Sequence, residues 1–216
     1  GRRIAAHNLE AAEVDIEFSD GRFAVVGTDR GLNMKEVAAL AFQPAMLPSG
    51  MESGLNGFDT FKSPGPTFPN ACHVSEVEID PETGVVTVLR YLAVDDVGTV
   101  MNPLLLKGQL HGGIVQGIAQ VLGERIVMDK SGQVLTGSFM DYQMPRADEY
   151  PSFEIETHIV PSPRNPLGIK GAGEAGTVGA VACLASAIHD ALAPLGVRSI
   201  DLPASSERIW QAVNAA

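Results

Sequence analysis

The sequence is poor in the residues that mark several common classes of protein. Two cysteines, Cys72 and Cys183, among 216 residues are too few for a disulfide framework, so both are expected as buried thiols in the reducing cytoplasm. Basic residues number 15 against 26 acidic ones, and the net charge of −11 argues against nucleic acid or an anionic membrane surface as a partner. Glycine, proline or polar residues interrupt the longest apolar runs, and no apolar core follows Arg2 and Arg3. We therefore expect neither a membrane span nor a signal peptide.

Several chemical motifs are missing as well. The five histidines are dispersed, and no group of His, Cys, Asp or Glu has the spacing of metal ligands. There is no phosphate-binding loop that ends in Lys-Ser or Lys-Thr, no Gly-x-Ser-x-Gly elbow and no basic patch with aromatic residues. A metal in this protein is therefore expected to arrive with an organic ligand of its own, and we assign no side chain as a metal ligand.

The residues that are present indicate a folded chain with many loops. Hydrophobic residues make up 45% and charged residues 19% of the sequence, which fits one large domain or two small ones. Glycine and proline number 23 and 14, too many for a simple helical bundle. The chain opens at Gly1 with a helical pattern already under way, so we expect a fragment or a processed subunit.

Hydrophobic periodicity and turn residues predict the main elements. Because strands and helices do not alternate regularly, we expect an α+β fold with mixed or antiparallel sheets and packed helices. Expected helices cover residues 2–13, 34–41 after Asn33, 104–122 after Asn102-Pro103, 178–188, and part of 202–216 with Ile209, Trp210 and Val213 inward and Ser205 or Ser206 as cap. Expected hairpins and strands cover 14–26, 73–80, 85–94, 126–136 and 153–160, and residues 43–70 form a long irregular loop, functional or draped over a partner.

The most unusual stretch runs from Gly171 to Ala180. Its four glycines surround a single ionisable residue, Glu174, and they allow the backbone to approach another group closely. Glu174 is expected at or just before the N-terminus of the following helix, where an exposed carboxylate is a candidate general base. A tight helix entry, with Glu174 stabilised by the helix dipole, is the alternative. The Gly-x-Gly-x-x-Gly spacing is weak evidence for dinucleotide binding, because the preceding segment 161–166 contains three prolines and cannot be a central strand.

A second unusual stretch is the expected helix over residues 104–122. Glycine in a helix costs about 1 kcal/mol relative to alanine, so Gly112, Gly113 and Gly117 need a reason, either close approach of a backbone or ligand or helix-on-helix packing. One face is apolar, and the other carries small and amide side chains: Leu110, Ile114, Ile118 and Val121 on the first; Gln109, Gly112, Gly113, Gln116 and Gln120 on the second. His111 is expected to be a hydrogen-bonded structural residue. Asp95 and Asp96, at a strand end, are expected as turn formers and caps.

These stretches occur in an order and spacing that resemble a known family. The residues that carry the resemblance are Asp96-Val97-Gly98, Asn102-Pro103, Gly108-Gln109-Leu110-His111-Gly112-Gly113 with Gln116-Gly117, Ser138-Phe139-Met140-Asp141-Tyr142, Pro161-Ser162-Pro163 and Lys170-Gly171-Ala172-Gly173-Glu174. From residue 1 to about 210 the chain resembles the C-terminal part of the molybdenum-binding large subunit of the xanthine oxidase family. Within that family it is most similar to the carbon monoxide dehydrogenase-like and aldehyde oxidoreductase-like branch. Residues 1–216 are then expected to be the C-terminal portion of the cofactor-binding domain.

The resemblance implies an oxidoreductase and a site. Glu174 matches the family's catalytic glutamate, which takes the proton from a molybdenum-bound hydroxyl during hydroxylation of an aldehyde, an N-heterocycle or a similar small substrate. Gln109 matches a glutamine close to the pterin. The remaining residues implied to contact a molybdopterin cytosine dinucleotide are Gly112, Gly113, Gln116, Lys170, Gly171, Ala172 and Gly173.

The resemblance also implies partners that this chain lacks. Electrons would pass to a 2Fe-2S subunit and an FAD subunit, the upstream part of the large subunit would complete the site, and the full assembly would be a dimer. Alone, the chain is expected to be incapable of turnover. Neither Cys72 nor Cys183 matches the substrate-loop cysteine of true carbon monoxide dehydrogenases, so carbon monoxide as substrate stays open. A non-catalytic scaffold of the same fold, with glycines that serve packing only, is the alternative function.

Overall fold

The computed structural model describes residues 1–215 and divides into two compact units, Gly1–Lys62 and Ser63–Ala216. The first unit contains a three-stranded antiparallel sheet in the order β1-β2-β3. Its elements are α1 (Arg2–Asn8), η1 (Glu13–Asp15), β1 (Ile16–Ser19), β2 (Arg22–Val25), β3 (Gly31–Asn33), α2 (Met34–Leu40) and η2 (Pro44–Met46). Ile4, Ile16 and Val37 lie in its core.

Local sequence signals explain most of the first unit. Asp20 and Gly21 both have positive φ, 48° and 75°, as a tight hairpin turn requires, so the predicted hairpin is confirmed. Asn33 and Glu36 form a reciprocal capping box at the start of α2, which confirms the predicted cap. The helix predicted over residues 2–13 was too long, because α1 ends at Asn8 and the backbone of Glu10 turns to a φ of 48°.

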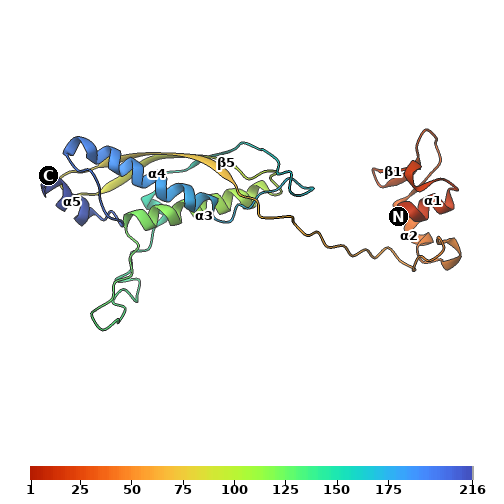
Figure 1. Ribbon diagram of the computed structural model, residues 1–216, viewed down its shortest axis with the longest axis horizontal. Helices are drawn as coiled ribbons and strands as arrows, with labels where there is room; N and C mark the ends of the chain where they lie inside the picture. The colour runs from red at the N-terminus through yellow and green to blue at the C-terminus, as the bar shows by residue number, and fades with distance from the viewer. Residues whose placement is uncertain (216) are drawn as a thin grey trace. The chain divides into compact units, whose positions relative to one another are not determined.

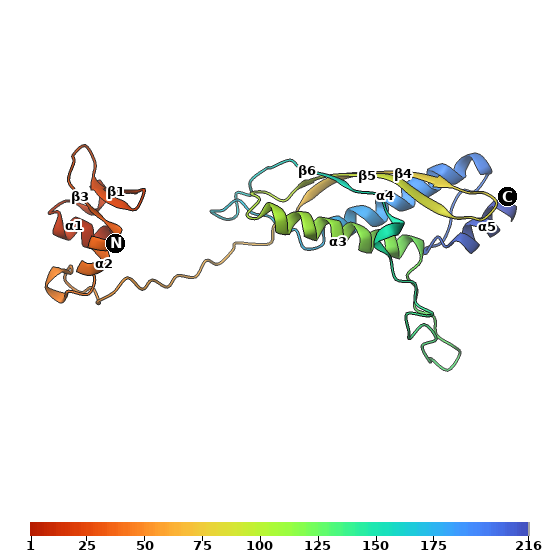
Figure 2. The same cartoon turned by 180° about the vertical axis from the view of Figure 1, so that it is seen from behind.

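The second unit is built on a mixed sheet, in agreement with the expected α+β class. Its strands are β4 (Asn70–Ile79), β5 (Val86–Asp96) and β6 (Glu154–Thr157), with β5 in the centre. β4 runs antiparallel to β5 and β6 runs parallel to it. Val77 and Ile79 pack against the core as predicted. Figure 2 shows the three strands as one layer above the helices.

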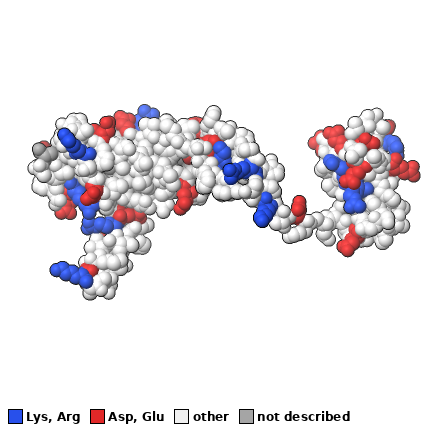
Figure 3. Space-filling view, in the orientation of Figure 1, with Lys and Arg blue, Asp and Glu red and all other residues white. Residues whose placement is uncertain are grey.

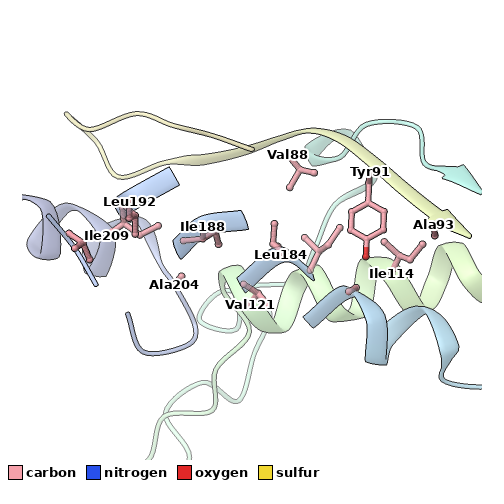
Figure 4. Close-up of a cluster of buried hydrophobic side chains, with 13 residues drawn as sticks. Val88, Tyr91, Ala93, Ile114, Val121, Leu184, Ile188, Leu192, Ala204 and Ile209 are labelled. Carbon is pink, nitrogen blue, oxygen red and sulfur yellow. The ribbon is translucent and has the colours of Figure 1, made fainter. Parts of the chain in front are cut away.

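Two long helices, α3 (Pro103–Leu122) and α4 (Ala175–Leu192), lie side by side against this sheet (Figures 1 and 2). Asn102 caps α3 by accepting a hydrogen bond from the Leu105 N–H, with Pro103 at the first helical position, so the predicted start is confirmed. The predicted apolar stripe is fully buried. The side chains of the core converge between the strands and the helices (Figure 4): Val88, Tyr91, Ala93, Ile114, Val121, Leu184, Ile188 and Leu192 among them.

The apolar character of α4 corrects one expectation. Residues Ala175–Leu195 are long and apolar enough to cross a membrane by length and composition alone, whereas the sequence was expected to contain no such run. In the structure Ala180, Leu184, Ile188 and Leu192 have no exposed surface and belong to the core cluster. Packing against α3 and β4 therefore accounts for these four residues, while 22% of the apolar window is buried.

The remaining segments of the second unit are short or irregular. Residues 126–136 form the predicted hairpin, closed by the pairing of Met128 with Val134, in an arm that leaves the end of α3 (Figure 1). The other elements are η3 (Ala147–Glu149), η4 (Ala193–Leu195) and α5 (Ser206–Ala215). Ser205 accepts a hydrogen bond from the Arg208 N–H and Ile209 is buried, as predicted. Trp210 was expected to face inward but is 45% exposed.

Candidate active site

Glu174 is the N-cap residue of α4, which confirms the position predicted for it. Its side chain is exposed, while the next two residues, Ala175 and Gly176, are buried. No side chain within residues 1–215 caps the first turn of α4, so the backbone N–H groups there are free of a side-chain acceptor. The carboxylate thus stands at the positive end of an 18-residue helix.

A hollow of about 520 Å³ lies directly beside this carboxylate. Residues 67–71, at the end of the long irregular segment, form one wall, and Gly171, Gly173, Glu174 and Val178 form the other. Phe68 and Val178 are 73% and 72% exposed. The predicted functional loop 43–70 therefore contributes its last residues to the site, where an apolar surface and one carboxylate face the same space.

Side chains from α3 hold the backbone around Glu174. The Gln109 amide nitrogen donates to the carbonyl oxygen of Gly173 at 2.5 Å. The Thr177 hydroxyl lies 3.0 Å from the carbonyl oxygen of Gly113 and 3.1 Å from the side-chain oxygen of Gln116. Three of the predicted cofactor residues, Gln109, Gln116 and Gly113, are thereby brought to the first turn of α4.

The helix glycines divide between the two roles considered for them. A Cβ atom at Gly117 would lie 2.6 Å from the Ala180 Cβ, and one at Gly113 would lie 3.0 Å from the Thr177 nitrogen. Gly176 faces α3 in the same way, 2.6 Å from the Leu110 oxygen. These three glycines serve close helix packing. A Cβ at Gly108 or Gly112 of α3, or at Gly173 just before α4, would meet no atom within 4 Å, so these positions present open backbone.

An ion pair that sequence reasoning missed anchors the segment before Glu174. The Lys170 ammonium lies 2.5 Å from the Asp96 carboxylate, and the two side chains are only 12% and 11% exposed. Asp96 also accepts hydrogen bonds from the N–H groups of Gly98 and Val160. The Lys170 ammonium first, and these two N–H groups, lower the pKa of Asp96 to about 2. Asp96 shapes a turn, as expected, but its main partner is 74 residues away.

Backbone contacts reinforce this anchor. The Lys170 N–H donates to the Val97 oxygen at 2.9 Å, and the Thr99 N–H donates to the Gly168 oxygen at 3.0 Å. Gly98, between them, has a φ of 65°, and a Cβ there would collide with the Gly168 oxygen. The segment that leads into the glutamate loop is therefore paired with the chain that follows β5.

Asp95, the residue before Asp96, has no exposed surface and faces a second group of buried polar side chains. Its carboxylate lies 3.7 Å from Nε2 of His73, whose side chain is 2% exposed. Nδ1 of His73 lies 2.7 Å from the Tyr91 hydroxyl. Burial raises the pKa of Tyr91 well above its usual value, so the hydroxyl keeps its proton. The alternation of β4 and β5 could have indicated these inward positions, but not their pairing.

The other singled-out residues have simpler surroundings. Nδ1 of His111 lies 2.8 Å from the Lys107 oxygen, which agrees with a structural role. The cysteines were expected to be buried, but Cys72 is exposed and Cys183 is half-buried. Burial raises the pKa of the Cys183 thiol. No group of three His, Cys, Asp or Glu side chains within residues 1–215 could hold a metal ion. Figure 3 shows charged side chains scattered in small groups over the visible face of the second unit.

Comparisons with known proteins show what the whole chain is similar to. The family described as the molybdopterin cofactor-binding domain matches residues 1–151. The carbon monoxide dehydrogenase large chain of Hydrogenophaga pseudoflava is 38% identical over 98% of this chain and 26% of its own length. The nicotine 6-hydroxylase large subunit of Paenarthrobacter nicotinovorans is 38% identical over 97% of this chain and 26% of its own length.

Solved structures show the same likeness. A Cu,Mo-CO dehydrogenase in its carbon monoxide reduced state matches with a TM-score of 0.93 and 37% identity, over 99% of this chain and 27% of that one. Quinoline 2-oxidoreductase from Pseudomonas putida 86 matches with a TM-score of 0.90 and 36% identity, again over 99% and 27%. The chain thus spans about a quarter of the length of the relatives that it matches.

Proposed function

The chain belongs to the molybdopterin cofactor-binding family of molybdenum hydroxylase large subunits, and we propose that it supplies the catalytic base of a water-dependent hydroxylation. Glu174 is the residue that performs this role. The observation that carries the proposal is its placement: an exposed carboxylate at a helix N-terminus, beside an apolar hollow and next to open backbone at Gly173.

The residues around Glu174 fit a molybdopterin cofactor. Gly112 and Gly173 leave room for a ligand to approach the backbone, and the first turn of α4 offers N–H groups to anionic or carbonyl oxygens. Gln109 and Gln116 have exposed side chains at the same place. The Lys170 ammonium is paired with Asp96. We therefore expect Lys170, Gly171 and Ala172 to contact the cofactor through their backbone atoms.

In this site the cofactor, in its cytosine dinucleotide form, supplies the two-electron redox chemistry. Glu174 acts as the base: its carboxylate accepts the proton that the water-derived oxygen nucleophile loses. The helices keep its carboxylate in place, and the apolar wall with Phe68 and Val178 orients the substrate and limits water. We propose an aldehyde, an N-heterocycle or a similar small molecule as substrate. Relatives named for nicotine and quinoline favour the heterocycles.

The rest of the proposal concerns the assembly. Because the relatives are about four times longer, residues 1–216 are proposed as the C-terminal portion of a cofactor-binding domain that the upstream part of the large subunit completes. A 2Fe-2S subunit and an FAD subunit are proposed to carry the electrons away, in a cytoplasmic dimer of the full assembly. Alone, this chain is expected to be inactive.

A scaffold without catalysis is the second candidate, and one observation favours it. Gly113, Gly117 and Gly176 serve helix packing, as a docking domain would require. Packing does not account for Glu174, because its side chain is exposed and caps no helix N–H. The proposal of a catalytic function therefore explains more of the site than the proposal of a scaffold does.

The direct test is Glu174→Gln in the assembled enzyme. We expect turnover per bound molybdenum to fall about 10³-fold, as for loss of a general base, with molybdenum content unchanged. Glu207→Gln is the matched control, because Glu207 is also an exposed glutamate at the start of a helix, α5, and it should leave turnover unchanged. Turnover that survives in Glu174→Gln would end the proposal.

The cofactor form and the need for partners are tested by content. We would measure molybdenum and acid-released cytidine monophosphate on this chain alone and on the chain produced with the upstream segment and partner subunits. Metal and nucleotide that appear only in the assembly would support a shared site. Their absence from both samples, when the cofactor machinery is active, would favour the scaffold.

A further inference from the structure

Two adjacent acidic side chains at the end of β5 lie near the two ends of the segment that carries Glu174. Asp96 meets Lys170, four residues before Glu174, and Asp95 meets His73, whose ring packs on Gly179, five residues after it. We propose that Asp95 and Asp96 are positioning residues that fix the two ends of the segment 170–179 and thereby the Glu174 carboxylate. This inference rests on the proposed function, because it concerns the placement of the proposed base.

The first contact fixes the entry to the loop. The Asp96 side chain takes three donors at once, the Lys170 ammonium and the N–H groups of Gly98 and Val160. The two charged side chains are almost fully removed from solvent, where an ion pair is less screened than at the surface. Lys170 is therefore held by its side chain and by its N–H, which donates to Val97.

The second contact fixes the start of the helix. The His73 ring lies so close to Gly179 that a Cβ atom there would collide with it. On its other edges the ring meets the Tyr91 hydroxyl and the Asp95 carboxylate. Within residues 1–215, neither oxygen of Asp95 nor Nε2 of His73 has a hydrogen-bond partner. The two groups lie 3.7 Å apart.

Such an arrangement lowers the stability of the fold, so its presence calls for a functional explanation. Burial of an acidic side chain without a hydrogen bond destabilises the fold, and an apolar pair of the same size would hold α4 against β4 at a lower cost. A buried polar contact specifies one geometry more narrowly than apolar packing does, because its orientation matters. The part of α4 that it fixes is the part that carries Glu174, and a displacement of about 1 Å in a catalytic group can cost about 10²-fold in rate.

The test uses the assembled enzyme and five variants. Asp96→Asn and Lys170→Met break the first contact, Asp95→Asn breaks the second, and Lys170→Arg keeps a cation at the first. Asp80→Asn is the matched control, because Asp80 holds the turn at the opposite end of the same hairpin through Thr83 and Glu82. For each variant we would measure kcat per bound molybdenum, KM, and hydrogen exchange of the amides of residues 171–179.

The expected pattern separates positioning from stability. Asp96→Asn, Lys170→Met and Asp95→Asn should lower kcat per molybdenum about 10²-fold with little change in KM, and should speed exchange in residues 171–179. Lys170→Arg should restore most of the rate, and Asp80→Asn should change neither quantity. Equal rates per molybdenum in all five variants, or exchange in residues 171–179 as slow as in the parent, would overturn the inference.

The exchange measurement keeps this inference distinct from the proposed function. It needs no molybdenum, so a variant that fails to load the cofactor is still informative. If Glu174→Gln retained full turnover, the proposed base would be wrong, while faster exchange in Asp96→Asn would still show that the carboxylates hold the segment. If Glu174→Gln lost turnover but Asp96→Asn and Asp95→Asn exchanged like the parent, only the positioning inference would fail.

Discussion

The two ends of the β4–β5 hairpin use aspartate in different ways. At the turn, Asp80 accepts hydrogen bonds from the Thr83 hydroxyl and the Glu82 N–H, both within three residues of it. These bonds, the Thr83 hydroxyl first, lower its pKa. At the opposite end, Asp96 binds Lys170, 74 residues away, and Asp95 is fully buried beside His73.

The difference is that the acidic side chain at the turn is exposed, whereas the two at the opposite end are buried. An exposed carboxylate that accepts hydrogen bonds within its own turn needs no distant partner, and these hydrogen bonds would also form in an isolated hairpin. The carboxylates at the other end are useful only after β5, the loop before Glu174 and α4 have come together. The contacts at the Asp80 turn therefore depend on local sequence, whereas those of Asp95 and Asp96 depend on the assembly of the candidate site.

The largest effects are expected from two tightly packed glycines, Gly84 in the turn of the β4–β5 hairpin and Gly176 in the first turn of α4. Gly84→Ala would drive a Cβ into the Ser206 oxygen, and Gly176→Ala would place one 2.6 Å from the Leu110 oxygen. Each should lower the free energy of unfolding by about 1–3 kcal/mol, as measured by urea denaturation. Only Gly176→Ala should also lower the rate per molybdenum. Equal loss of rate in both would remove the distinction between the ends.

The second largest effect is expected in how stability depends on pH when Asp96 is replaced. The pKa of Asp96 is lowered to about 2 in the folded protein, so its stabilising contribution is complete above about pH 4 and is lost as the pH falls toward 2. We expect Asp96→Asn to lower Tm at pH 6 and to match the parent near pH 2. Thermal unfolding from pH 2 to 7 measures this, and a Tm difference that is independent of pH would contradict it.

The hydrogen bond between Tyr91 and His73 should have a smaller effect. Tyr91→Phe removes the hydroxyl 2.7 Å from Nδ1 of His73 and leaves the rest of the buried ring in place. A loss of about 1 kcal/mol in unfolding free energy is expected for one buried hydrogen bond. Phe153→Leu, which alters the neighbouring ring but no hydrogen bond, is a control for packing. An unchanged stability in Tyr91→Phe would show that the contact is not formed.

The smallest effect is expected from the exposed pair between β5 and β6. Arg90 and Glu154 lie 2.8 Å apart, but their side chains are 67% and 55% exposed, so solvent and salt screen their attraction. Glu154→Gln should leave Tm and the rate per molybdenum unchanged within error. A clear loss of Tm at low salt would show that exposure is a poor guide to which charges matter here.

Much of this structure could be predicted from local patterns. Asn102-Pro103 determines where α3 begins, Asp20-Gly21 determines a hairpin, and the apolar run after Glu174 predicts α4. In each case the signal lies within a few residues of the feature. The prediction of a candidate site around Glu174 rests on the same kind of signal, because Glu174 is a single carboxylate among glycines.

The contacts that hold the site could not be predicted in this way. Nothing near Lys170 or Asp96 in the sequence indicates the partner of either, since partners 74 residues apart depend on how β5 and the loop meet. The glycines of α3 look alike in the sequence, but only the rotation of α3 against α4 decides that Gly113 and Gly117 are covered and Gly112 is open. Trp210 was misplaced because its side chain lies at the border of the buried face of α5.

The most direct test of the central claim is a crystal structure of the assembled enzyme, with the metal located by anomalous scattering at the molybdenum edge. We predict that Glu174 is the ionisable side chain of this chain nearest to the molybdenum, with the contacts from Gln109 to Gly173 and from Lys170 to Asp96 intact. A molybdenum centre to which this chain contributes no nearby atom, or one that Glu174 faces away from, would contradict the account.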